Sequence, residues 1–548
     1  MRTAVIGAGA AGLTCVRQAR AAGLDVICFE KAAELGGIWN PAGGGAYAGV
    51  RMQSSRMSMP FSDHPPTFAA DFPTQAEVQD YLRSYAERYG LLDAVEFGSE
   101  VVRVARADGG WAVTARTADG RERTERVDAV MVANGELWQP RLPARLPEPG
   151  APVKVLASPQ YRGAAEYAGQ RVLVVGGGVS GADIAADLAG TAARVDWSVR
   201  RRQLFLPRSI GGLYNDALFS YAGRVAVEEL PYAEYLAWMG ELDPDYLAMY
   251  RATGLLPESG FHGAVHVNER IVPKVFAGEV HPVAAFGGFA ADGSVEFADG
   301  SGGTYDAVVL CLGYEMPDYS FIEPLPGELL RREDLYEHHF WRHDPTLAVV
   351  NTPVDTEAFG TACPYFEAVA GWVLAVHTGK AALPDERERA EWCARHLGAL
   401  EDRRYLDCWL ETVRLGLLSG TLPDPAVDFG AYWTLVASQV DPANLSPANQ
   451  SPESLTSANL DSADLEPADL DPGRARPVPA ALDHRLDLAG VRHRILAALP
   501  LDVRERLLAA GEVDVADLAG AAAVPAGREL APWLPYRQRE DDWVRAAA

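Results

Sequence analysis

Two stretches of the chain share one pattern of apolar and small residues. A short β-branched, apolar run at residues 3–6 is followed by closely spaced glycines and then by a stretch with helical spacing that ends near Gly23. The run RVLVV at residues 171–175 is followed in the same way by glycines and by SGADIAADLAG. A strand, a tight turn and a helix in this order build parallel α/β sheets. The pattern therefore predicts an α/β fold in which this unit occurs twice.

The pattern changes beyond about residue 385. Residues 386–420 have helical spacing, and residues 442–471 repeat every five residues as PANLS PANQS PESLT SANLD SADLE PADLD, close to the A(D/N)Lxx pentapeptide repeat. We favour an acidic, extended or partly ordered linker here over a turn and a half of square β-helix, because the repeat offers little leucine core. Residues 481–520 return to apolar spacing of three and four, which predicts a small helical module.

Composition narrows the classes of function. No uninterrupted apolar run approaches the roughly 20 residues that a membrane-spanning helix needs. A net charge of −26 opposes the phosphate neutralisation on which nucleic-acid binding depends, and it repels anionic lipid surfaces. Six cysteines are few for 548 residues, and none forms a Cys-x-x-Cys motif or a zinc-ligand cluster. We therefore expect a cytoplasmic protein without a targeting segment, a metal, a nucleic-acid partner or a membrane partner.

The first glycine-rich turn has the spacing of a dinucleotide-binding site. Gly7-x-Gly9-x-x-Gly12 follows the first strand, and the second strand, DVICFE, ends on Glu30. In such a motif the first glycine allows the turn, the second lets the backbone approach a pyrophosphate, and the third allows close packing of helix and strand. Glu30 can accept hydrogen bonds from ribose hydroxyls. A glycine-rich turn with a purely structural role is the alternative.

The segment KAAELGGIWN follows Glu30 directly. Its Gly36-Gly37-x-Trp39 resembles the segment that lies against the flavin in the flavin-containing monooxygenases, which are class B flavoprotein monooxygenases. The resemblance implies that the first site holds FAD, whereas the alternative is a Gly-Gly loop with a packed tryptophan. The residues expected to bind FAD are Gly7, Gly9, Ala10, Ala11, Gly12, Glu30, Gly36, Gly37, Trp39, Gln53 and Val101.

The second glycine-rich turn predicts a second dinucleotide, and one flavin plus one nicotinamide explains the duplication. No carboxylate ends the following strand, ARVDWSVRRRQLFLPR, where three arginines stand instead. A guanidinium can form a charge-assisted pair with the 2′-phosphate of NADPH, and Arg200 also resembles the family's Ser-x-Arg strand. The alternative is that two of the three arginines are only solvated. The residues expected to bind NADPH are Gly176, Gly178, Ser180, Gly181, Arg200 and Arg201.

The resemblance also implies how the chain is divided. AVMVANGELWQPRLP (129–143) and AVVLCLGYEMP (307–317) resemble the segments in which the family's chain crosses between its two Rossmann-like domains. It implies an FAD-binding domain of residues 1–140 and 314–395, with an NADPH-binding domain of residues 141–313 inserted. Beyond it we expect a mainly helical C-terminal extension that consists of helices at 396–440, the repeat linker at 441–480 and a small helical module at 481–548.

Gln53 is the candidate catalytic residue. In the family, a flavin reduced by NADPH reacts with O2 to give a C4a-hydroperoxide, and an Asn lies near the flavin edge that reacts. In AYAGVRMQSSRMSMPFSDHPP (46–66) the corresponding residue is Gln53. Gln keeps the amide but extends it by one methylene, about 1.5 Å. The alternative is a loop amide that binds the backbone.

The favoured function is NADPH- and FAD-dependent oxygenation of a small molecule, with N-oxygenation of an amine or amino acid in specialised metabolism preferred. The class fingerprint Phe-x-Gly-x-x-x-His is absent, because APVKVLASPQY has Ala151, Val153 and Ala157 at its three positions. This absence argues against a Baeyer–Villiger reaction, which stays an alternative function together with sulfoxidation. The third alternative function is an NADPH-dependent flavin reductase without oxygen insertion. The expected partners are a small-molecule substrate and O2, and a homodimer is left open.

Overall fold

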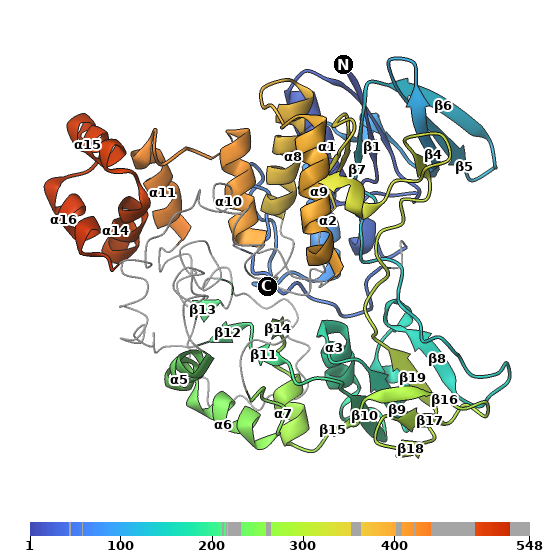
Figure 1. Ribbon diagram of the computed structural model, residues 1–548. Coiled ribbons are helices and arrows are strands. Elements are labelled where there is room, and N and C mark those ends of the chain that lie inside the picture. Colours follow the sequence, from blue (N-terminus) through green and yellow to red (C-terminus); the bar gives the residue numbers. More distant parts are fainter. Residues whose placement is uncertain are drawn as a thin grey trace.

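The computed structural model describes residues 1–42, 45–56, 58–210, 213–214, 216, 232–258, 265–351, 363–401, 408–420, 422–439 and 488–525. These ranges contain two separate α/β units, one around a sheet that begins at the N-terminus and one around a second sheet (Figure 1). The α/β fold class with two Rossmann-like units is confirmed.

The first sheet has the strand order β21-β22-β23-β7-β1-β2-β3. Val5 of β1 packs with helices α1, α2 and α8, whereas Ala4 and Ile6 pack with the β4-β5-β6 meander on the other face. Successive side chains of a strand point to opposite faces, so an apolar run such as β1 is buried on both. The bounds are β1 Arg2–Ile6, α1 Ala10–Ala21, β2 Asp25–Phe29, α2 Gln75–Arg88, β3 Val95–Glu96, β4 Ser99–Ala107, β5 Gly110–Thr117, β6 Glu122–Val127, β7 Ala129–Val132, β20 Ile322–Glu323, β21 Leu335–Tyr336, β22 Phe340–Trp341, β23 Leu347–Val349 and α8 Cys363–His377.

The second sheet is parallel and has the order β15-β10-β9-β19-β8. Helices α3 and α7 cover one face, and the β16-β17-β18 hairpins cover the other. The expected domain boundaries at residues 140 and 313 lie in the two segments that link the sheets. The bounds are β8 Lys154–Ala157, β9 Arg171–Val175, α3 Val179–Leu188, β10 Arg194–Ser198, β11 Leu204–Leu206, β12 Ser209–Ile210, β13 Leu213–Tyr214, α5 Tyr232–Leu242, α6 Pro244–Ala252, β14 Val265–Val267, α7 Ile271–Phe276, β15 Val280–Val283, β16 Phe286–Phe289, β17 Val295–Phe297, β18 Gly302–Gly303 and β19 Ala307–Leu310.

The C-terminal helices are attached at two places. Leu415 of α10 is buried in the core that α1 and α8 form over the first sheet. Phe429 and Tyr432 of α11 are instead buried among α14, α15 and α16, which lie at the far left of Figure 1. The repeat at 441–480 and the ends of the expected module at 481–548 lie outside the described residues. The bounds are α9 Glu386–Glu401, α10 Cys408–Ser419, α11 Phe429–Gln439, α14 Leu488–Ala498, α15 Leu501–Ala510 and α16 Val515–Ala523.

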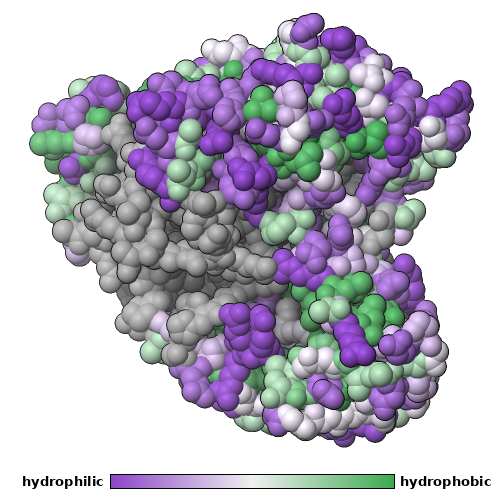
Figure 2. All heavy atoms as spheres, turned by 45° about the vertical axis from the view of Figure 1, so that its right-hand side comes forward, coloured by the Kyte–Doolittle hydropathy of each residue, from purple (hydrophilic) through white to green (hydrophobic). Residues whose placement is uncertain are grey.

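Figure 2 shows hydrophilic side chains over much of the upper part and a recess at the right between the upper and the lower part. Among the helices in the described ranges, none combines the length and the apolar character that a membrane span requires.

Arg414 joins α10 to the first sheet through a buried ion pair. Its side chain is 1% exposed, and its Nη1 lies 2.6 Å from Oε2 of Glu337, in the turn between β21 and β22. The guanidinium also lies over the ring of Trp372 on α8, 5.5 Å from the ring centroid. Glu337 has a φ of +46°, which non-glycine residues rarely adopt. The ion pair therefore holds a strained turn as well as α10.

We expect Arg414→Ala to lower the free energy of unfolding by about 3–5 kcal/mol, because it leaves the Glu337 carboxylate without its partner. Urea denaturation followed by far-UV circular dichroism measures the change. Arg387→Ala is the matched control, since Arg387 and Glu391 form an exposed pair on α9 that contributes little. Equal losses in the two variants would mean that α10 is not held by this ion pair.

Candidate functional site

Backbone segments lie so close together at the carboxyl end of β1 that two positions of the first turn must be glycine. Gly7 has a φ of +103°, and a Cβ atom on it would lie 2.4 Å from the carbonyl oxygen of Ala133, directly after β7. A Cβ atom on Gly12 would lie 1.8 Å from the carbonyl oxygen of Gly7. A side chain at either position would therefore force the turn, the helix and the crossing strand apart.

Gly9 differs from these two glycines because the space beside it is open. A Cβ atom on Gly9 would come no closer than 3.5 Å to another residue, and that neighbour is the Cα atom of Gly37. Gly9 caps α1 without a side-chain hydrogen bond, and the first turn of α1 holds no acidic residue. The backbone N–H groups that begin a helix have no partner within it. Residues 9–12, including Ala10 and Ala11, thus form a cradle that suits a pyrophosphate.

Glu30 lies at the end of β2, next to this cradle, and is 6% exposed. Its Oε2 accepts a hydrogen bond from the N–H of Ala8 at 2.7 Å, and its Oε1 accepts one from the N–H of Ala32 at 2.8 Å. These bonds fix the carboxylate in place. Because each carboxylate oxygen has a second lone pair, Glu30 can still accept hydrogen bonds from two ribose hydroxyls.

The Gly36-Gly37 turn is held against the cradle. The N–H of Gly36 donates to the carbonyl of Ala8 at 3.0 Å. Gly36 and Gly37 both have positive φ values, +117° and +58°, and Trp39 then packs on the core of the first sheet. A Cβ atom on Gly37 would lie 3.1 Å from the Cα atom of Gly9, so the two glycines, which are both predicted to bind FAD, lie side by side.

Gln79 of α2 lies behind this turn and was missed by the sequence analysis. Its Nε2 donates to the carbonyl of Leu35 at 2.9 Å. A Cβ atom on Gly36 would lie 1.9 Å from its Oε1, and this buried oxygen accepts no hydrogen bond from any described residue. The available signal was a glutamine between the buried residues Val78 and Tyr81 of an amphipathic helix. An unsatisfied buried acceptor suits a hydrogen-bond donor of a bound cofactor.

These features fit FAD. The open cradle and the fixed carboxylate lie at the end of the first sheet, and the unsatisfied Gln79 oxygen lies beside the Gly36-Gly37 turn that contacts the cradle. Bound there, the flavin would supply hydride acceptance and reaction with O2, which no side chain can perform. Val101 of β4, the last residue expected at this site, is half-buried at a β-bulge and packs on the core beneath the meander.

The second glycine turn repeats the geometry of the first. Gly176 has a φ of +125°, and a Cβ atom on it would lie 2.1 Å from the carbonyl oxygen of Cys311, directly after β19. A Cβ atom on Gly181 would lie 1.9 Å from the carbonyl oxygen of Gly176. Gly178 caps α3 without a side-chain hydrogen bond, and Ser180 lies in its first turn. This turn fits a second pyrophosphate for the same physical reasons.

The three arginines after β10 differ in their contacts. Arg202 forms an ion pair with Glu258 at 2.5 Å. Arg200 and Arg201 are exposed and form no ion pair with a residue in the described ranges. The carbonyl of Arg201 would lie 3.8 Å from a Cβ atom on Gly177, so this segment borders the glycine turn. Arg200 and Arg201 are thus better placed than Arg202 to meet a 2′-phosphate.

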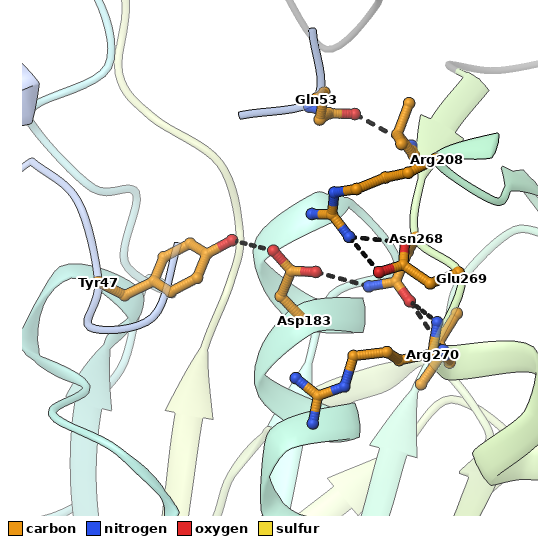
Figure 3. A network of polar contacts seen from close by, with 9 residues as sticks. Tyr47, Gln53, Asp183, Arg208, Asn268, Glu269 and Arg270 are labelled. Carbon is orange, nitrogen blue, oxygen red and sulfur yellow. Dashed lines mark hydrogen bonds and ion pairs between the residues drawn. The ribbon is translucent and has the colours of Figure 1, made fainter. Parts of the chain in front are cut away.

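Gln53 belongs to the segment between Trp39 and α2 of the first unit, and its side chain contacts the second unit. Its Oε1 accepts a hydrogen bond from the N–H of Val267 at 3.0 Å, at the end of β14 (Figure 3). The amide therefore does bind the backbone, as the alternative interpretation expects, but through its oxygen only. Its Nε2 has no hydrogen-bond partner among the described residues and keeps two donors.

In the part of the chain that the structure describes, no three His, Cys, Asp or Glu side chains are grouped so that they could hold a metal ion.

Comparisons with known proteins point to one family. The flavin-binding monooxygenase-like (FMO-like) family matches residues 1–407. Flavin-containing monooxygenase 5 of Rattus norvegicus is 28% identical over 78% of this chain and 86% of its own length. Dimethylaniline monooxygenase [N-oxide-forming] 4 of the same species is 29% identical over 71% of each chain. The solved structure of S-allyl-L-cysteine S-oxygenase from Allium sativum has a TM-score of 0.55 and 24% identity, covers 76% of this chain and 88% of its own, and shows the shared fold.

We expect Gly9→Val to abolish FAD binding, because the side chain would fill the open space between Gly9 and Gly37. The absorbance of bound flavin per protein measures the loss, and circular dichroism verifies folding. Gly178→Val, the equivalent change in the second turn, should keep FAD and weaken NADPH binding. A folded Gly9→Val protein that remains yellow would place the cofactor elsewhere.

We expect Arg200→Ala to lower kcat/KM for flavin reduction by NADPH by roughly one to two powers of ten, which is the effect of losing one charge-assisted contact. Reduction by NADH should change little. Arg202→Ala serves as the control, since Glu258 already pairs with Arg202. The measurement is anaerobic stopped-flow reduction with each nucleotide. Equal losses with both nucleotides would assign Arg200 a structural role.

Proposed function

The chain belongs to the flavin-binding monooxygenase-like family, and from that premise we propose that it oxygenates the nitrogen of a small amine or amino acid in specialised metabolism. As a family member it is a flavin-dependent monooxygenase that uses FAD, NADPH and O2. The overall reaction is balanced when one oxygen atom of O2 enters the substrate and the other leaves as water, while NADPH and a proton are consumed.

The observation that carries the proposed role of Gln53 is its hydrogen bond from one unit to the other. Gln53 belongs to the segment that follows the Gly36-Gly37 turn of the first unit, and Val267, whose N–H donates to its oxygen, belongs to the unit with the second cradle. Its free Nε2 can donate a hydrogen bond near the edge of the flavin where O2 reacts. We propose that this donor and the surrounding loop keep water from that edge.

One comparison supports the preference for nitrogen, and one residue argues against a Baeyer–Villiger reaction. The relative from Rattus norvegicus that matches 71% of this chain is described as N-oxide-forming. Ala157, at the fingerprint's histidine position, is 5% exposed and has no polar group, so it cannot form the hydrogen bond of a histidine. A Baeyer–Villiger reaction is disfavoured on this ground. Sulfoxidation is the second candidate, because the Allium sativum protein with the shared fold is an S-oxygenase.

The test uses the full chain with FAD, NADPH and isotopically labelled O2. Primary, secondary and tertiary amines, amino acids, thioethers of matched size and a cyclic ketone are incubated separately, and product mass is read by mass spectrometry. N-oxygenated products with one labelled oxygen atom support the proposal. Sulfoxides alone would establish the second candidate, and an ester would establish the Baeyer–Villiger reaction. NADPH oxidation that yields only hydrogen peroxide would favour the flavin reductase.

We expect Gln53→Ala to leave flavin reduction by NADPH largely intact and to divert O2 to hydrogen peroxide. The substitution removes a hydrogen bond that contributes about 1 kcal/mol, and water enters more easily. Gln53→Asn should be milder, since it restores the family's amide. Peroxide released per NADPH oxidised, measured beside product yield, decides the outcome. If Gln53→Ala forms product as efficiently as the parent enzyme, Gln53 serves only as a backbone-binding loop residue.

A further inference from the structure

A polar network joins the loop that carries Gln53 to helix α3 of the second sheet (Figure 3). The hydroxyl of Tyr47, a side chain that is 5% exposed, lies 2.5 Å from Oδ2 of Asp183. The Nδ2 of Asn268 donates to the other oxygen of Asp183, Oδ1, at 2.6 Å. Both oxygens of Asp183 therefore accept hydrogen bonds: Oδ2 from Tyr47 in the loop of the first unit, and Oδ1 from Asn268 in the second unit.

Asn268 cannot turn its amide round without a cost. Its Oδ1 accepts hydrogen bonds from the N–H groups of Arg270 at 2.9 Å and Ile271 at 2.7 Å, at the start of α7. These bonds cap the helix, so the NH2 group must face Asp183. Oδ1 of Asp183 is therefore an acceptor, and Oδ2 is left for Tyr47.

The surrounding charges favour this arrangement. Burial raises the pKa of the Asp183 carboxyl, but Arg208 nearby and the hydrogen bond from Tyr47 oppose that rise. Arg208 is in turn bound through its Nη1 to both carboxylate oxygens of Glu269, at 2.6 Å each. Without the Tyr47 hydroxyl, a partly buried carboxylate oxygen would lose its donor, which costs more than an ordinary surface hydrogen bond.

Gln53, which belongs to the same loop as Tyr47, contacts the residue next to Asn268. It accepts a hydrogen bond from the N–H of Val267, the residue directly before Asn268. Tyr47 and Gln53 therefore bind two neighbouring points of the second unit, and Asp183 lies only two residues beyond Gly181 of the second cradle. The helix whose N-terminus would meet the pyrophosphate of NADPH is thus tied to the loop of Gln53.

We propose that Tyr47 is a positioning residue, which acts through Asp183 and Asn268 to hold Gln53 in place relative to the second nucleotide cradle. The proposal rests on the proposed function insofar as Gln53 acts at the flavin. The hydrogen-bonded link itself does not depend on that function, and it can be tested separately.

The chain supplies a matched control one helical turn away. The hydroxyl of Tyr161 lies 2.5 Å from Oδ2 of Asp187, also on α3. Tyr161 follows the short 3-10 helix Ser158–Gln160 of the second unit, so its hydroxyl contact stays within one unit. Its backbone carbonyl accepts a hydrogen bond from the N–H of Ala48, and Tyr161→Phe leaves that bond in place. Tyr47→Phe and Tyr161→Phe therefore remove the same group from the same helix, but only Tyr47→Phe cuts a link between the units.

The first measurement is hydrogen–deuterium exchange of the full-length protein with FAD bound. In Tyr47→Phe, exchange of peptides that contain residues 46–56 should rise about two- to tenfold, the population change that corresponds to one lost hydrogen bond. Exchange there should stay at the parent level in Tyr161→Phe. Unchanged exchange in Tyr47→Phe, or an equal rise in both variants, would overturn the link, whether or not the protein is an oxygenase.

The second measurement is hydrogen peroxide released per NADPH oxidised in air. Tyr47→Phe should release about two- to tenfold more with an unchanged FAD content, and Tyr161→Phe should match the parent. Adding Tyr47→Phe to Gln53→Ala should add little, because Tyr47 acts through Gln53. A full, independent increase in the double variant would overturn the positioning role.

Two further outcomes keep the tests separable. If Tyr47→Phe does not fold, Asp183→Ala takes its place, since it removes both oxygens that bind Tyr47 and Asn268, and it should give the same two results. A parent protein that oxidises no NADPH in air would refute the proposed function, while the exchange experiment would still decide whether the link exists.

Discussion

Close contact between backbone segments at the two glycine turns is the constraint on which the rest of the site depends. At each turn a carbonyl oxygen from a neighbouring strand, that of Ala133 or Cys311, occupies the space of a side chain. The turn, the helix that follows and the crossing segment must therefore be placed together. This arrangement brings the N-terminus of each helix to the carboxyl edge of its sheet, where ligands of open α/β sheets bind.

The contacts between the two units are of a different kind. Within each unit the sheet is covered on both faces by apolar clusters. Between the units, many of the contacts are polar: besides the network of Tyr47, the hydroxyl of Tyr214 donates to Asp71 at 2.7 Å, and the N–H of Ser55 donates to Asp216 at 2.5 Å. Tyr47 and Phe72 of the first unit are also buried in the apolar cluster of the second, so polar and apolar contacts together hold the two units.

The glycine units could be predicted from the sequence because each strand, turn and helix is coded within about thirty consecutive residues. Contacts between distant segments could not. The hydrogen bond of Gln53 joins residues that are 214 positions apart, and the same amide was compatible with either interpretation. The helical spacing of residues 408–419 predicts a helix with one apolar face. It does not indicate which core that face joins, and the structure shows Leu415 in the core of the first sheet. Gln79 carried a signal only once its neighbours were known to be buried.

The likeness of the two cradles has a consequence for competition between ligands. Backbone that accepts one pyrophosphate accepts another, so neither turn can by itself distinguish FAD from NADPH. Discrimination would fall on the residues at the end of the next strand, Glu30 in one case and Arg200 with Arg201 in the other. Glu30 would repel a 2′-phosphate, whereas the arginines would attract it, and specificity of this kind often uses repulsion as well as attraction. The protein would thus sort two similar dinucleotides, both present in the cell, by the sign of charge at a single ribose.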